Sequence, residues 1–146
     1  MKNIPEDNKY FYFYNANPKG KDIGDCTYRA MSVFLNRSWA DIAKMDSQYY
    51  ISSGMWFYTD VLVDGKCRSL LGDYLKANGY ECVYSSEGKG ISSISSLRSF
   101  IDTVAEADKV YLCITSGHIT VIKDMKVWDT WDSSGRFPEE IYVASV

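Results

Sequence analysis

The sequence lacks the features by which several common classes of protein are recognised. Its 16 Lys and Arg residues stand against 19 Asp and Glu residues, so the net charge is −3 and there is no basic surplus. Without that surplus the chain cannot neutralise many phosphates, and we expect no nucleic-acid partner. No run reaches the roughly 18 apolar residues that a membrane span needs, so we expect no membrane partner either.

A secretion signal is also missing from the start of the chain. Residues 1–9 are polar and contain no apolar core or cleavage site, which leads us to expect a cytoplasmic protein. The chain has four cysteines, an even number that would suggest disulfides in a small secreted protein. In a reducing compartment the better prediction is four free thiols.

Histidine is nearly absent, and this bears on metal binding. His118 is the only histidine, and no two cysteines form a C-x-x-C pair. A structural zinc site needs about four Cys or His ligands, usually supplied as closely spaced pairs. We therefore expect neither a metal site nor a cofactor.

The composition is that of a folded domain. Hydrophobic residues make up 46% of the 146 residues and aromatic residues 15%, with twelve tyrosines. A chain of this length buries most of its apolar surface in one core, so we predict a single domain over 1–146.

Apolar periodicity predicts the secondary structure and the fold class. Most of the helices precede most of the strands, which indicates an α+β domain. We leave 46–56 as mixed loop and short helix. The predicted helices are 26–35, 39–45, 66–78 and about 96–107, and the predicted strands are 9–14, 80–84, 109–115, 118–122, 127–131 and 140–146.

The most informative stretch is Gly24–Ser32, in which Cys26 follows a glycine-containing turn and opens an amphipathic helix. The free N–H groups and the dipole at a helix N-terminus stabilise negative charge, so a cysteine there can ionise below its ordinary pKa. A buried structural thiol is the alternative interpretation.

His118 supplies the complementary base, at the start of a β-branched strand. If Lys123 and Lys126 flank a two-residue turn, Asp129 lies opposite Thr120 and on the same face as His118. A slip of one residue would instead place Asp132 opposite His118. Asp129 is therefore the favoured third residue and Asp132 the alternative.

Two motifs carry a resemblance to a known family. Gly24 to Ala30 reads G-D-C-x-x-R-A, and a second block runs from Gly117-His118 to Asp129-Thr130-Trp131-Asp132-Ser133. The order cysteine, histidine, carboxylate resembles the papain-like cysteine hydrolases, and the two motifs are most similar to those of short bacterial and phage proteins. The resemblance implies a papain-like fold, with N-terminal helices packed on a C-terminal antiparallel sheet. It also implies a bacterial cell or a phage-infected host as the setting.

The same resemblance implies a catalytic triad of Cys26, His118 and Asp129, with a thioester formed at Cys26. Papain-like enzymes use a glutamine shortly before the cysteine to stabilise the oxyanion, and this chain has none there. Asn17 and Lys19, in the turn before Cys26, are the candidate donors.

Two functions of different classes follow from these observations. The first is a small cysteine hydrolase or acyltransferase acting on a peptide or protein substrate. The second is a catalytically inactive scaffold that binds a partner such as a host protein, which the many tyrosines would suit. A redox sensor that pairs Cys26 with another thiol is a third interpretation, and it would need two Cα atoms within about 7 Å.

Overall fold

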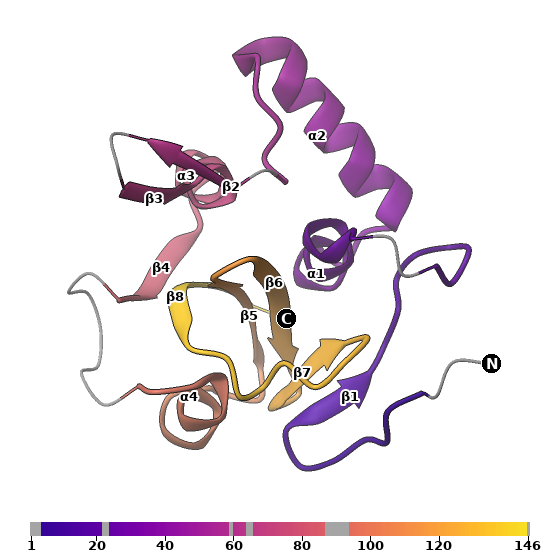
Figure 1. Cartoon of the computed structure of the whole chain (residues 1–146), viewed down its shortest axis with the longest axis vertical. Coiled ribbons are helices and arrows are strands. Elements are labelled where there is room, and N and C mark those ends of the chain that lie inside the picture. Colours follow the sequence, from indigo (N-terminus) through magenta and orange to yellow (C-terminus); the bar gives the residue numbers. More distant parts are fainter. Residues whose placement is uncertain (1–3, 22–23, 59, 64–65, 87–93, 146) are drawn as a thin grey trace.

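The computed structural model describes residues 4–21, 24–58, 60–63, 66–86 and 94–145, with 60–63 and 66–69 described by their backbone alone. Figure 1 shows the arrangement of the elements. In chain order they are β1 (Phe11–Phe13), α1 (Cys26–Leu35), α2 (Trp39–Ser53), β2 (Asp60–Val63), β3 (Lys66–Ser69), α3 (Leu70–Ala77), β4 (Glu81–Ser85), α4 (Leu97–Thr103), β5 (Lys109–Thr115), β6 (His118–Lys123), β7 (Lys126–Asp129) and β8 (Pro138–Ser145).

The main sheet has six strands in the order β1-β7-β6-β5-β8-β4. All neighbours in it are antiparallel except β1 and β7, which run parallel. The strands β2 and β3 form a separate antiparallel pair. The predicted α+β class is therefore confirmed, with a mixed main sheet.

The expectation of a purely antiparallel, C-terminal sheet is wrong in one respect, because the N-terminal strand β1 forms an edge of it. The backbone N–H of Val127 donates to the Tyr10 carbonyl at 2.8 Å, and that of Tyr14 donates to the Asp129 carbonyl at 2.9 Å. Phe11 is completely buried between them and anchors the strand. This pairing fixes the end of β7, where Asp129 lies.

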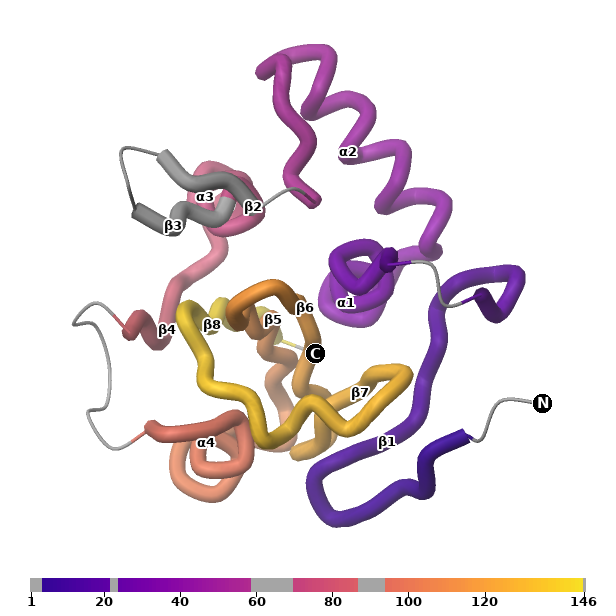
Figure 2. The backbone as a smooth tube through the Cα atoms, in the orientation of Figure 1, coloured from indigo at the N-terminus to yellow at the C-terminus, as the bar shows by residue number. Residues whose placement is uncertain are grey.

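Helices cover both faces of the sheet (Figure 2). Strand β5 shows why, since its alternate residues belong to two apolar clusters. Val110 and Leu112 pack with α1, α2 and α3, whereas Tyr111 and Cys113 pack with α4 on the other face. A strand buried on both faces becomes almost continuously apolar, which explains the composition of this segment.

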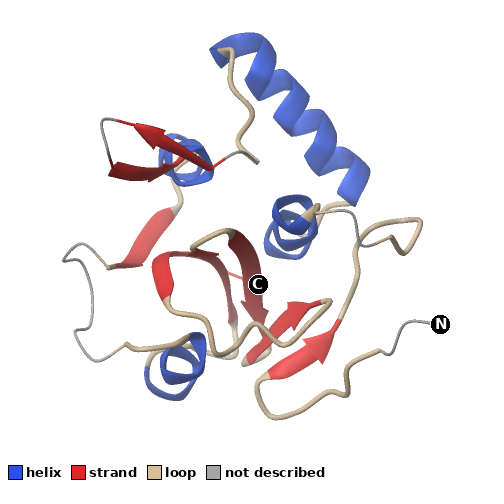
Figure 3. Ribbon diagram, viewed as in Figure 1, coloured by secondary structure: helices blue, strands red, loops and turns tan. Residues whose placement is uncertain are grey.

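Several helices and strands begin or end at residues other than those predicted. Figure 3 shows the helices, strands and loops as the structure has them. Helix α2 continues to Ser53, because Gly54 adopts a left-handed φ of 77° and its N–H donates to the Tyr50 carbonyl. The helix predicted over 66–78 begins at Leu70, since 66–69 pair with β2. The side chain of Cys67, expected in the core, lies outside the described residues. Helix α4 ends at Thr103, and β7 ends at Asp129.

Among the described residues, none of the helices combines the length and the apolar character required to cross a bilayer.

Candidate active site

Helix α1 presents Cys26 at its first turn, directly after Asp25. The Asp25 side chain does not cap the helix. It accepts hydrogen bonds from Asn17 Nδ2 at 3.0 Å and Trp39 Nε1 at 2.7 Å, and it forms an ion pair with Arg29 Nη1. Since these donors hold the carboxylate, it does not compete for the N–H groups of the first turn of α1.

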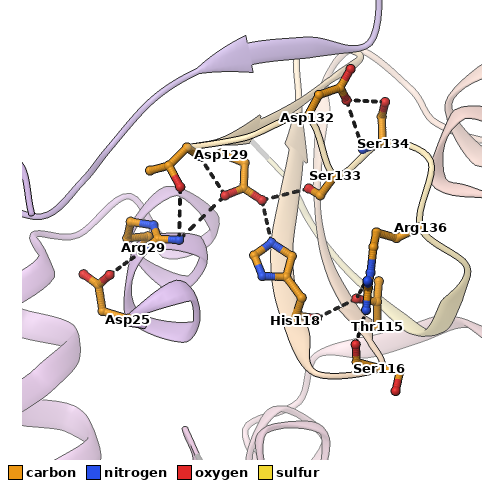
Figure 4. A network of polar contacts seen from close by, with 11 residues as sticks. Asp25, Arg29, Thr115, Ser116, His118, Asp129, Asp132, Ser133, Ser134 and Arg136 are labelled. Atoms are coloured by element: carbon orange, nitrogen blue, oxygen red, sulfur yellow. Dashed lines mark hydrogen bonds and ion pairs between the residues drawn. The ribbon is translucent and has the colours of Figure 1, made fainter. Parts of the chain in front are cut away.

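The hairpin between β5 and β6 positions His118. Thr115 is opposite His118 in the register, and its hydroxyl donates to the His118 carbonyl at 2.8 Å. Gly117 occupies the turn with a φ of 69°, a conformation that suits glycine. Arg136 reaches across from the segment before β8 and donates to the Ser116 carbonyl, as Figure 4 shows. The Ser116-Gly117 turn before His118 is therefore stabilised by a residue outside the hairpin.

The second hairpin decides which carboxylate meets His118. Strand β6 pairs with β7 in the predicted register, with Val121 opposite Trp128 and Lys123 opposite Lys126. Both turn residues between them have positive φ, 51° at Asp124 and 63° at 125, as a two-residue hairpin turn requires. The predicted register is confirmed, although neither turn residue is glycine.

In this register His118 Nε2 lies 2.7 Å from Asp129 Oδ2 (Figure 4). Asp132 points elsewhere and binds Asn8, Arg98 and Ser134. The structure thus brings Cys26, His118 and Asp129 together and keeps the alternative carboxylate, Asp132, apart from the imidazole.

Asp129 is only 4% exposed and is held from several directions. Ser133 Oγ donates to its Oδ2 at 2.8 Å, and the Thr130 N–H donates to its Oδ1 at 2.7 Å. Arg29 Nη2 lies 3.7 Å from Oδ1. Burial raises the pKa of Asp129, but the hydrogen bond and charge of His118, with the Ser133 bond, bring it below its usual value. The carboxylate therefore stays ionised beside the imidazole.

The thiol and the imidazole shift each other's pKa values toward the charged forms. Burial raises the pKa of Cys26, but hydrogen bonds to His118 and to the Ile119 backbone outweigh it. The positive charges of His118 and Arg29 lower it further, below the ordinary 9.0. Burial lowers the pKa of His118, but its bonds to Asp129 and Cys26 raise it to about 9. Both shifts favour the pair of a thiolate and an imidazolium over the pair of a neutral thiol and a neutral imidazole.

The indole of Trp131 covers the imidazole. Its ring lies 4.7 Å from the His118 ring, centroid to centroid, at an interplanar angle of 45°. Trp131 is 41% exposed. The indole therefore shields one side of the imidazole while its own outer surface faces solvent.

The two candidate oxyanion donors lie in different environments. Asn17 is buried, with its Nδ2 donating to Asp25 and its Oδ1 accepting from the Lys19 N–H at 2.9 Å. Lys19 is exposed. Asn17 thus supports Asp25, the neighbour of Cys26, and one of its two amide hydrogens is already used there.

Sequence reasoning missed two residues of the site. Arg29 joins Asp25 to Asp129, and Ser133 is a completely buried donor to Asp129. Both lie within the two motifs, Arg29 three positions after Cys26 and Ser133 four positions after Asp129, and this position was the available signal. Their partners could not be read from spacing, because Arg29 and Asp129 are a hundred positions apart in different elements.

Cys26, Cys82 and Cys113 are free thiols. Within the part of the chain that the structure describes, no three His, Cys, Asp or Glu side chains gather as metal ligands would.

Comparison with known proteins found no match to the chain among protein-family models, curated proteins or solved structures.

Proposed function

We propose that the chain is a small papain-like cysteine hydrolase or acyltransferase that acts on a peptide or amide bond through a thioester at Cys26. The observation that supports it best is the series Cys26, His118, Asp129, in which His118 and Asp129 are buried, the pKa of the thiol is lowered and that of the imidazole is raised. A thiolate at a helix start beside an imidazolium is the arrangement that thiol nucleophiles use.

In the first half-reaction the Cys26 thiolate attacks the substrate carbonyl carbon, and the carbonyl oxygen becomes an oxyanion. The Cys26 N–H is the natural donor to this oxyanion, since Asp25 does not cap the first turn. The C–N bond then breaks, and the His118 imidazolium gives its proton to the departing amine. The products are a free amine, a thioester on Cys26 and a neutral imidazole.

In the second half-reaction the neutral imidazole removes a proton from water, and the resulting hydroxide attacks the thioester carbon. The C–S bond then breaks, Cys26 leaves as the thiolate beside the protonated imidazole, and a carboxylic acid is released. If an amine takes the place of water, the product is a new amide and the reaction is acyl transfer. Asp129 holds Nε2 of the imidazole throughout, so that Nδ1 remains for the thiol and the substrate. The expected substrate is a peptide or protein in the cytoplasm of a bacterium or of a phage-infected cell.

Alkylation by iodoacetamide at pH 6, with the sites mapped by mass spectrometry, tests the proposal without a known substrate. Cys26 should react first, and His118→Ala should slow it strongly. Equal reactivity of the cysteines in the native protein would contradict the proposal. Hydrolysis of a peptide mixture by the wild type, with Cys26→Ala as the control, then tests turnover itself.

The binding scaffold is the second candidate, and an exposed apolar surface favours it. Ile51 is 82% exposed at the end of α2, and Met55 is 47% exposed just beyond it. Tyr50 stacks on Trp56 nearby, with centroids 4.5 Å apart. A Cys26 thiol that reacts no faster in the wild type than in His118→Ala would favour this candidate over the enzyme.

A further inference from the structure

A cavity of about 320 Å³ adjoins the start of helix α1. The residues just before and just after Cys26 line it, so it lies beside the proposed nucleophile. Its volume is at the lower end of the range for ligand sites, which suits one large side chain better than a whole cofactor. The lining residues are Gly24, Asp25, Thr27, Tyr28, Trp39 and Tyr58.

Three of its six lining residues are aromatic. Tyr28 lies edge-on to Trp39, with centroids 5.4 Å apart, and edge-on to Tyr58 at 6.0 Å. The polar ends of two of these rings are already bonded: the Tyr28 hydroxyl donates to Asp46 at 2.7 Å, and Trp39 Nε1 donates to Asp25 at 2.7 Å. These rings therefore present carbon to the cavity.

The one carboxylate in the wall does not make the cavity a cation site. Asp25 is paired with the buried Arg29 and also accepts from Asn17 and Trp39. Burial raises the pKa of Asp25, but these partners bring it below its usual value. Its charge is therefore already compensated within the protein, and an arriving cation would have to compete with Arg29.

We infer that this cavity is a specificity subsite that receives a large apolar, preferably aromatic, side chain next to the bond that is cleaved. The inference rests on the proposed function, since it takes Cys26 as the nucleophile. The cavity would select among substrates because burial of a flat apolar group in it is favourable, whereas a polar group would find few free partners there.

Three alkylating probes test the inference by their rates at Cys26: iodoacetamide, N-benzyl-iodoacetamide and N-(4-aminobutyl)-iodoacetamide. The benzyl probe should react roughly tenfold faster than iodoacetamide, as expected for one apolar group entering a fitted pocket. Tyr58→Ala should remove most of this ratio, and Tyr58→Phe should retain it. Tyr58 is 51% exposed, so its truncation is compatible with folding.

Tyr12→Ala is the matched control, because Tyr12 is a partly exposed tyrosine on β1, packed on Trp128. It should leave the benzyl ratio unchanged. No benzyl preference, or one that Tyr58→Ala does not alter, would overturn the inference, and so would a faster reaction of the aminobutyl probe. Failure of the proposed function is a separate result, namely an iodoacetamide rate that is the same in the wild type and in His118→Ala.

Discussion

Cys26 and Cys113 are both free thiols, yet their surroundings shift their pKa values in opposite directions. Cys113 lies in β5 with no exposed surface, and burial alone raises its pKa. Cys26 is only partly buried, and burial raises its pKa too, but His118, the Ile119 N–H and Arg29 reverse the effect. The difference between the two sites lies in their charged and N–H neighbours.

This contrast explains why the two thiols suit different roles. A thiol among apolar side chains is a small hydrophobic residue, whereas one beside an imidazolium is a nucleophile. The neighbours of Cys26 come from β6 and from its own helix, and the carboxylate that supports the imidazole comes from β7. Reactivity at Cys26 thus depends on the packing of α1 against the β6–β7 hairpin.

The largest expected effect is the difference between the two thiols themselves. In the native protein Cys26 should be alkylated at least about 10³-fold faster than Cys113, because Cys113 reacts only when the core opens. Labelling with iodoacetamide at pH 7, quenched at intervals and mapped by mass spectrometry, measures the ratio. In denaturant the two rates should converge. A ratio near one in the native protein would show that the two thiols do not differ in reactivity.

His118→Ala should make the alkylation rate of Cys26 more like that of Cys113. Without the imidazolium the thiol loses a hydrogen bond and a positive charge, so its pKa rises and its alkylation at pH 6 should fall roughly 10²-fold. The helix start and Arg29 remain, which is why some activation should persist. A rate at pH 6 that is unaffected by the substitution would mean that the imidazole does not activate the thiol.

The pH dependence of peptide hydrolysis by the wild type tests the same pair, Cys26 and His118. On the acid side activity should rise as the thiolate forms, below the ordinary thiol pKa of 9.0, because the pKa of Cys26 is lowered. On the alkaline side it should fall near pH 9, where His118, with its pKa raised to about 9, loses the proton that the leaving amine needs. A profile that rises only through pH 9 would contradict an ion pair.

Asp129→Asn should have a smaller effect than His118→Ala. The amide keeps the shape but removes the charge that stabilises the imidazolium, so the pKa of His118 should fall and alkylation of Cys26 at pH 6 should slow roughly tenfold. Asp132→Asn is the matched control. It removes a carboxylate that binds Arg98 and Ser134 rather than His118, and it should change the rate less than about twofold. The reverse ranking would reassign the third residue.

The placement of these groups shows which parts of the site the sequence could supply. The contact between His118 and Asp129 follows from a two-residue turn and the period of a strand, both of which are local. The start of α1 at Cys26 likewise follows from a glycine turn and an apolar periodicity. These local rules also predicted the strands β5 and β6 closely.

Apart from the meeting of Cys26 and His118, which the family resemblance implies, contacts between distant segments were not predicted. The parallel pairing of β1 with β7 depends on a segment at the other end of the chain, and neither strand alone signals its partner or direction. Arg29 could not be assigned to Asp129 for the same reason. The strand 66–69 was predicted as helix because its residues continue the apolar spacing of α3, whereas pairing with β2 decides its conformation.

Arg29 lies between Asp25, the neighbour of Cys26, and Asp129, the partner of His118. Its substitution should affect the stability of the protein more than the reactivity of Cys26. Among the groups that lower the Cys26 pKa, Arg29 acts by charge alone, without a hydrogen bond to the thiol. Arg29→Gln should therefore slow alkylation at pH 6 only about threefold. It also leaves the buried Asp25 and Asp129 without their shared cation, which should lower the unfolding free energy by about 3–5 kcal/mol and the Tm by about 10 °C.

Arg29→Lys keeps the charge but lacks the forked guanidinium that reaches both carboxylates. It should therefore recover the alkylation rate but only part of the stability. Thermal unfolding and the labelling rate, measured on the same samples, separate the two effects. If Lys restored the melting temperature in full, a positive charge alone would hold the site together, and the bridge between Asp25 and Asp129 would have no separate role.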